Sequence, residues 1–138
     1  MPRSHAVATA LSAKMRADQA EGAFYDDLGG RIYEGEAQQS DILPICVWTF
    51  TSVVPEQIFA NADTLNVLMQ ADVWNSRIKG AQGCRNIHDK LVDLLDRADD
   101  VVADGYATVA VICQDQGSPR VEEDSYRQTS QWRLWALV

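Results

Sequence analysis

One stretch of the chain decides the fold: residues 64–74, which read TLNVLMQADVW. Apolar and polar side chains alternate along it, and a period of two is typical of a β-strand with one buried face. The apolar set comprises Leu65, Val67, Met69, Ala71 and Val73, and the polar set comprises Asn66, Gln70 and Asp72. We therefore predict a strand here, with its apolar set turned toward a hydrophobic core.

Three further stretches have the composition of strands. Residues 43–54 are rich in β-branched and aromatic side chains, and Pro44 stands near their start, where its missing N–H does little harm. Residues 107–113 alternate in the same way as residues 64–74, and residues 125–138 form a long terminal stretch that contains Trp132 and Trp135. Together with residues 64–74, these stretches predict four strands.

Two helices are predicted, one before the first strand pair and one between the two pairs. Residues 5–21 follow Ser4, a residue suited to cap a helix, and are rich in alanine. Residues 80–98 place their apolar side chains on one helical face. Residues 23–28 add a short turn, and residues 31–33 a brief extended segment.

The order α-β-β-α-β-β predicts an α+β fold, with a mainly antiparallel four-stranded sheet and two helices packed on one face. We expect a single domain over residues 1–138. The strands carry more apolar residues than one covered face requires, so the opposite face is expected to pack against an adjacent copy of the chain. Trp48, Trp132 and Trp135 are expected to contribute either to that contact or to the core.

The charge balance narrows the partners. Twelve Lys and Arg residues stand against 20 Asp and Glu, for a net charge of −8, so the chain has no general attraction for nucleic acid or anionic lipid. No apolar run approaches the length of a membrane span, and the first residues show no signal-peptide pattern, so we expect a cytosolic product with no membrane partner. The three cysteines are expected to be free and reduced.

A search for chemistry finds no specific pattern. Cys84 and His88 are four residues apart on one predicted helix, but a zinc site needs three or four ligands. The acidic clusters lie beside glycines or in loops, where carboxylates are usually solvated, and the Gly29-Gly30-Arg31 turn does not connect a strand to a helix as a phosphate loop does. We therefore predict no catalytic residues, no cofactor and no metal, and this result favours a structural or binding role.

The sequence resembles the tail-completion or tail-terminator proteins of long-tailed bacteriophages, over nearly its full length. The matching features occur in order along the chain: Gly29-Gly30-Arg31-Ile32-Tyr33, Pro44-Ile45-Cys46-Val47, Val73-Trp74-Asn75-Ser76 and Trp132-Arg133-Leu134. The sequence departs from the family pattern at Ile45, where members usually have an aromatic residue.

The resemblance implies a non-enzymatic virion protein of the tail or neck, assembled in the host cytoplasm. Such a protein forms a ring, generally a hexamer, that caps the tail tube and joins it to the head-completion proteins, with an open channel through which DNA passes unbound. The implied partners are other copies of the chain, the tail tube protein and the head-completion or stopper protein. Two alternatives stay open: a head-closure or stopper protein of the same neck, and a small-ligand-binding regulatory α+β domain.

Two segments are candidates for contacts within such an assembly. Residues 54–61 are predicted to connect two strands and to present Ile58 and Phe59, which would either anchor in a neighbouring ring or tube or fold back on the sheet edge. Residues 114–124 form a polar arm ending in Glu122, Glu123 and Asp124, and these carboxylates are expected either to line the channel or to lie on the outside of the ring.

Overall fold

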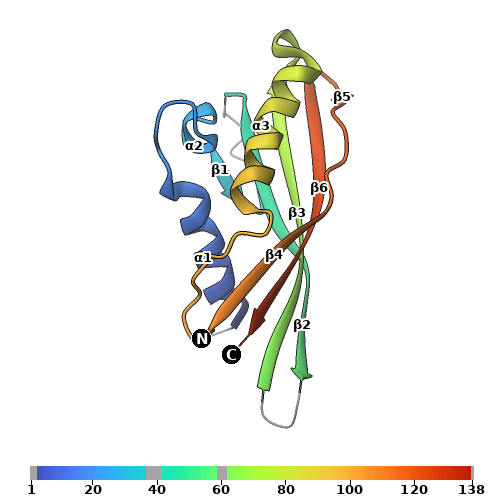
Figure 1. The fold of residues 1–138 in the computed structure, drawn as a ribbon. Coiled ribbons are helices and arrows are strands. Elements are labelled where there is room, and N and C mark those ends of the chain that lie inside the picture. Colours follow the sequence, from blue (N-terminus) through green and yellow to red (C-terminus); the bar gives the residue numbers. More distant parts are fainter. Residues whose placement is uncertain (1–2, 37–41, 59–61, 138) are drawn as a thin grey trace.

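A computed structural model describes residues 3–36, 42–58 and 62–137, and it consists of one twisted sheet with its helices on a single side (Figure 1). The helices are α1 (Arg3–Ala17), α2 (Phe24–Asp27) and α3 (Gly80–Leu95), the last preceded by a 3-10 turn, η1 (Arg77–Lys79). The strands are β1 (Ile32–Glu34), β2 (Ile45–Ile58), β3 (Ala62–Ser76), β4 (Thr108–Asp115), β5 (Arg120–Glu122) and β6 (Ser125–Leu137).

The α+β class is confirmed, but the sheet is larger than predicted and is mixed. Its strands lie in the order β1-β2-β3-β6-β4, and β5 pairs with the start of β6. The four long strands are antiparallel neighbours, whereas β1 runs parallel to β2 and aligns with Cys46 to Trp48. The prediction of four strands was wrong because β1 and β5 are three residues long, too short to show any alternation.

The core lies between the sheet and the helices. The apolar set of β3 is buried, as predicted, with Leu65 3% exposed and the other four fully covered. Strand β6 adds Trp132 and Leu134 to this layer. The helices cover it with buried side chains at helical spacing: Val7, Leu11 and Met15 of α1, and Cys84, Ile87, Leu91 and Leu95 of α3.

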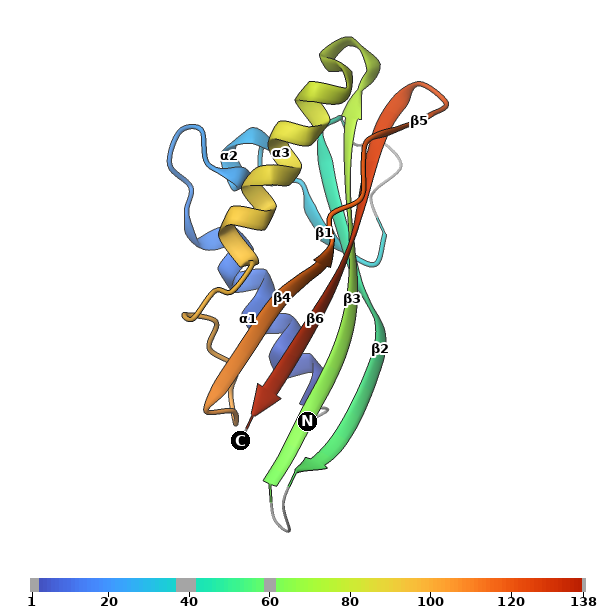
Figure 2. The ribbon, with the colours of Figure 1, turned by 45° about the vertical axis from the view of Figure 1, so that its right-hand side comes forward.

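The molecule is elongated along its long strands. Strands β2 and β3 extend beyond the helices at one end, and η1 lies at the opposite end (Figures 1 and 2). The predicted connection over residues 54–61 was therefore wrong in part, because residues 54–58 are strand and pair with β3 in continuous register up to Ile58 and Ala62. A bulge between Phe50 and Ser52 precedes this extension.

The outer edge of β4 is closed by the loop that follows α3. The N–H of Arg97 donates to the carbonyl oxygen of Val111 at 2.8 Å, and the N–H of Cys113 donates to the Asp96 carboxylate at 2.8 Å. Arg97 reaches this position through a left-handed backbone, with φ of 58°. These bonds occupy groups that a strand of another chain would need, so this edge is a poor site for sheet extension.

Candidate functional site

The side of the sheet that faces away from the helices is the largest structural feature without a partner in the described chain. We call it the open sheet face. The strand register places its residues in cross-strand rows, because residues directly opposite each other on neighbouring strands share a face. These rows divide the open sheet face into an apolar half, near the β2–β3 hairpin, and a polar half, near η1.

The apolar half contains apolar side chains on four strands: Val54, Leu68, Ala110, Ile112, Trp135 and Leu137. Two polar residues lie among them, Asn66 opposite Trp135 and Arg133 opposite Leu68, and Arg133 donates to the Asn66 side-chain oxygen at 3.4 Å. Val54 is 48% exposed, and Ile112 and Leu137 are exposed by more than a third. The guanidinium of Arg133 lies over the indole of Trp135, 5.5 Å from the ring centroid. An exposed apolar group with an aromatic residue at its centre is typical of a contact surface.

The polar half is organised around one ion pair. The Arg127 Nε donates to the Asp72 carboxylate at 3.1 Å, and its Nη1 donates to Glu122 at 3.2 Å. Thr129 also donates to Asp72, and the Arg127 guanidinium stacks on Trp74 at 4.8 Å from the ring centroid. The hydrogen bond to Asp72 raises the pKa of Arg127, so this group stays charged.

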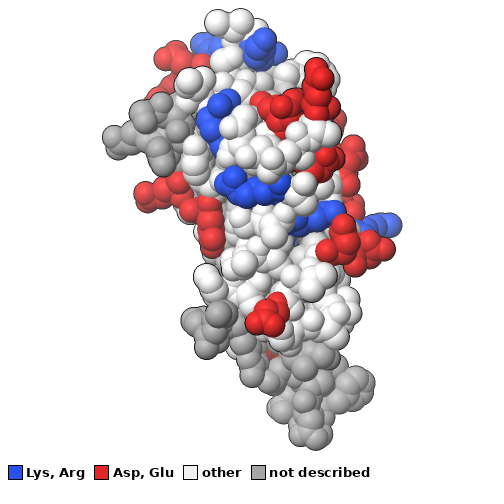
Figure 3. Space-filling model, turned by 90° about the vertical axis from the view of Figure 1, so that its left-hand side faces the viewer, with Lys and Arg blue, Asp and Glu red and all other residues white. Residues whose placement is uncertain are grey.

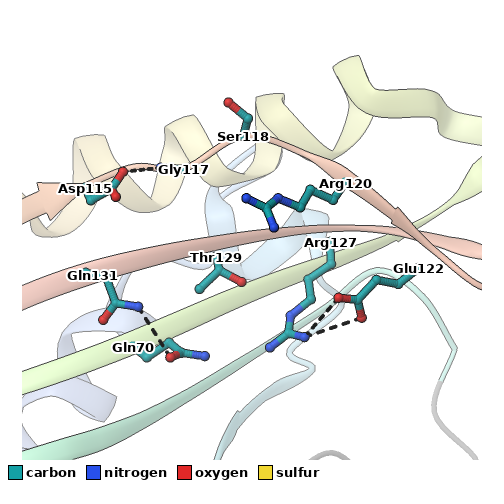
Figure 4. A pocket seen from close by; sticks show the side chains of 9 residues that line it. All are labelled: Gln70, Asp115, Gly117, Ser118, Arg120, Glu122, Arg127, Thr129 and Gln131. Atoms are coloured by element: carbon teal, nitrogen blue, oxygen red, sulfur yellow. Dashed lines mark hydrogen bonds and ion pairs between the residues drawn. The ribbon is translucent and has the colours of Figure 1, made fainter.

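The arm of residues 114–124 runs along the edge of β6 beside the polar half, and its β5 segment pairs with the start of β6. The side-chain amide nitrogen of Gln128 donates to the backbone carbonyl oxygen of Gln116 at 3.1 Å. Gly117 has φ of 64°, and a Cβ at this position would lie 2.1 Å from the Thr129 carbonyl oxygen, so only glycine allows so close an approach. Between arm and sheet lies a pocket of about 360 Å³, bordered by charged and amide side chains that include Gln70, Asp115 and Arg120 (Figure 4).

The structure separates the three tryptophans that the sequence grouped together. Trp48 and Trp132 are 2% and 0% exposed and belong to the core, which is one of the two expected alternatives. Trp135 alone of the three lies on the open sheet face. Trp74, which was not among the predicted contact residues, also lies there, with the Arg127 guanidinium over its ring.

The remaining predicted residues fall into four situations. Glu122 bonds Arg127, whereas Glu123 and Asp124 are exposed at the turn between β5 and β6. Ile58 is the last residue of β2, and Phe59 lies outside the described residues.

The cysteines and the histidine that could have suggested chemistry are buried in the molecule and do not lie on the open sheet face. His88 is fully covered, burial lowers its pKa, and neither ring nitrogen has a hydrogen-bond partner among the described residues. Burial raises the pKa of Cys46 to about 12 and that of Cys84 to about 11, so both thiols are poor nucleophiles. Within residues 3–36, 42–58 and 62–137, no group of three or more His, Cys, Asp or Glu side chains could hold a metal ion. None of the described helices is long and apolar enough to cross a membrane.

An open sheet face with exposed apolar side chains is typical of proteins that assemble with others. A solved chain from the virion of a native gene transfer agent particle has the same fold, with a TM-score of 0.70 and 16% identity over 97% of this chain and 99% of that one. A second solved chain matches with a TM-score of 0.65 and 11% identity, over 100% of this chain and 97% of that one. No curated protein matches the sequence.

Residues 9–136 match the family described as tail completion protein gp17, and the chain belongs to that family. The resemblance predicted from the sequence is thereby confirmed. The protein is a structural component of the tail of a phage-like virion.

Proposed function

We propose that the protein forms a ring, a hexamer, that caps the tail tube and joins it to the head-completion protein, with an open channel for DNA. The observation that carries this proposal is the apolar half of the open sheet face, which one chain leaves exposed around Trp135. In a ring, each subunit contacts the next through two different surfaces, so one surface covers the apolar half of its neighbour.

The helical side of the molecule offers a matching surface at the same level. Near the start of α1 the helix exposes small side chains, and the adjacent loop presents Val102, which is 80% exposed. Acidic and basic side chains are interspersed on the helical side, mainly over its upper part (Figure 3). We therefore assign the apolar half and the α1–Val102 surface as the two sides of one head-to-tail contact.

The two ends of the molecule are available for the neighbouring layers. The β2–β3 hairpin extends past the helices, and we propose that its tip, with Ile58 and Phe59, docks on the ring or tube next to it. If particles with Phe59→Ala still join their heads to their tails normally while the isolated chain loses stability, the side chain belongs to the core instead.

The arm of residues 114–124 is proposed to face the channel. Glu123 and Asp124 are exposed and supply carboxylates that repel the DNA backbone, whereas Glu122 is neutralised by Arg127. This role requires no catalysis, and we propose that the protein is not an enzyme. Burial raises the pKa of the Cys46 and Cys84 thiols and lowers that of His88, so all three side chains stay uncharged and contribute to packing.

Gel filtration with light scattering, followed by negative-stain microscopy, tests the ring directly. We expect particles of about six subunits with a central hole, formed either by the protein alone or after mixing with purified tail tubes. Val102→Asp is expected to reduce ring formation, because it places an unpaired charge in the proposed contact. A protein that stays monomeric under both conditions contradicts the proposal.

A further inference from the structure

Arg133 is a cation without a carboxylate partner in the apolar half of the open sheet face. Its guanidinium lies over the Trp135 indole, and its one described hydrogen bond is long, from Nη1 to the Asn66 side-chain oxygen at 3.4 Å. The Nε is covered and has no hydrogen-bond partner among the described residues. Glu56 accepts from the nitrogen of the same Asn66 amide at 3.1 Å, but within the described chain it forms no ion pair with Arg133. A guanidinium with unused donors on an apolar surface can bind a carboxylate from another molecule.

The helical side of the molecule contains a hollow of about 340 Å³ beside the start of α1. Its wall includes small side chains of α1 and two residues of the loop before β4: Ala6, Ala10, Ala13, Val102 and Asp104. The same loop is bonded to the end of β6, because the N–H of Ala107 donates to the Leu137 carbonyl oxygen at 2.8 Å. The hollow and Trp135 therefore lie at the same level along the molecule, on opposite sides of the sheet (Figure 1).

Asp104 supplies a carboxylate at this hollow that is available for pairing. The residue is exposed, and its carboxylate has no hydrogen bond or ion pair with any residue that the structure describes. Asp100, on the same loop, is instead bonded to Lys14 at 2.8 Å. In the lower part of the helical side, where α1 starts, acidic side chains are visible and basic ones are not (Figure 3). The hollow and the open sheet face therefore carry opposite charges at the same level of the molecule.

We propose that Trp135 of each subunit enters the hollow of the next subunit, and that Arg133 pairs there with Asp104 of the partner subunit. The pairing rests on the proposed function in one respect, that copies of this chain are arranged head to tail. A second copy is favoured over a different protein because the complementary surface lies on this same chain. Apolar contacts alone tolerate sliding of one subunit along the other, whereas an ion pair in apolar surroundings fixes one register.

Charge reversal tests the pair, with assembly measured by light scattering and negative-stain microscopy. Arg133→Glu and Asp104→Lys are each expected to weaken assembly about 100-fold or more, because each places two like charges together in a contact closed to water. The matched control is Asp99→Lys, the same change at an exposed carboxylate of the same loop that does not border the hollow, and it is expected to assemble normally. Urea unfolding shows that each monomer is folded. If Arg133→Glu does not fold, Asp104→Lys still decides, because its normal assembly overturns the pairing.

Two rescue experiments show whether the pair joins different chains. The double variant Arg133→Glu with Asp104→Lys restores attraction at every contact and is expected to assemble. An equimolar mixture of the two single variants is also expected to form rings, in which the two kinds of subunit alternate, and native mass spectrometry is expected to count equal numbers of each. Rescue in the double variant but not in the mixture would place the pair within one chain and overturn the proposal. The absence of any rescue, or an equal loss in Asp99→Lys, overturns it as well.

The outcomes separate this pair from the ring itself. A wild type that forms no rings, alone or with tail tubes, refutes the ring and the pair together. Wild-type rings that persist in both single variants refute the pair alone. If Arg133→Glu forms normal rings but no longer joins heads to tails, the open sheet face binds a different virion protein, and the proposal is again overturned.

Discussion

We expect Trp132→Ala to destabilise the monomer and Trp135→Ala to weaken assembly, although the two residues are three apart on one strand. Trp132 is fully buried, and its indole N–H donates to the Ser130 hydroxyl at 2.7 Å. Its removal leaves a large cavity, at a cost of about 3–5 kcal/mol, which is a large part of the total stability of a typical domain. Trp135 is partly exposed, and its main described contact is the cation–π pair with Arg133, worth about 0.5–1 kcal/mol.

Urea unfolding of the monomer, at a concentration low enough to prevent assembly, measures how much stability each variant loses. Trp132→Ala is expected to be unfolded or nearly so, and Trp135→Ala to lose about 1 kcal/mol, or roughly 3–4 °C in Tm. Light scattering over a concentration series measures how strongly each variant assembles, and Trp135→Ala is expected to weaken assembly about ten-fold or more. Comparable losses of monomer stability in the two variants, or unchanged assembly of Trp135→Ala, would refute this assignment of the open sheet face.

Three further outcomes are expected from single sites. Burial lowers the pKa of His88 below its ordinary value of 6.5, so the unfolded chain binds the proton more readily and stability falls as the pH drops through about 6.5. His88→Leu should flatten this pH dependence in urea midpoints measured between about pH 7.5 and 5. An unchanged slope in the variant would count against this explanation. Gly117→Ala should release the arm from β6, because its Cβ has no room beside the strand, and faster proteolysis or hydrogen exchange confined to residues 114–124 would show it. In native protein an alkylating reagent should modify Cys113, which is half-buried, far faster than Cys46 and Cys84, and mass spectrometry of the digested protein checks this order.

The long elements could be predicted because their burial is written into the chain as periodicity. The alternation in residues 64–74 identified both the strand and its buried face, and the one-sided apolar pattern of residues 80–98 identified α3. The same approach failed for the end of β2, where Pro55 and Glu56 are typical of a turn. Proline is accommodated there because β2 has no described neighbour on its outer side at that level, and β3 supplies the ladder that local preference does not.

The candidate site was predictable only in part, because it depends on register between strands. The sequence indicated that one sheet face had an apolar surplus, but it could not show that Trp74 lies beside Arg127 or that Trp135 lies beside Arg133. One signal was available in β6: once Trp132 and Leu134 are assigned to the core, the residues that alternate with them, Arg133 and Trp135, must face outward. The arm could not be placed at all, since its position beside β6 depends on the close approach of Gly117 to that strand.

The position of β3 has a mechanical consequence. This strand runs from the β2–β3 hairpin at one end of the molecule to η1 at the other, and it is bonded to β2 on one side and to β6 on the other along nearly its whole length. A pull along the long axis of the molecule is therefore transmitted along a single central strand. The hydrogen bonds of an antiparallel ladder stand perpendicular to that direction, so they bear the load together, in shear, instead of opening one after another. The sheet of this tail-completion protein is therefore built to resist a pull along its long axis.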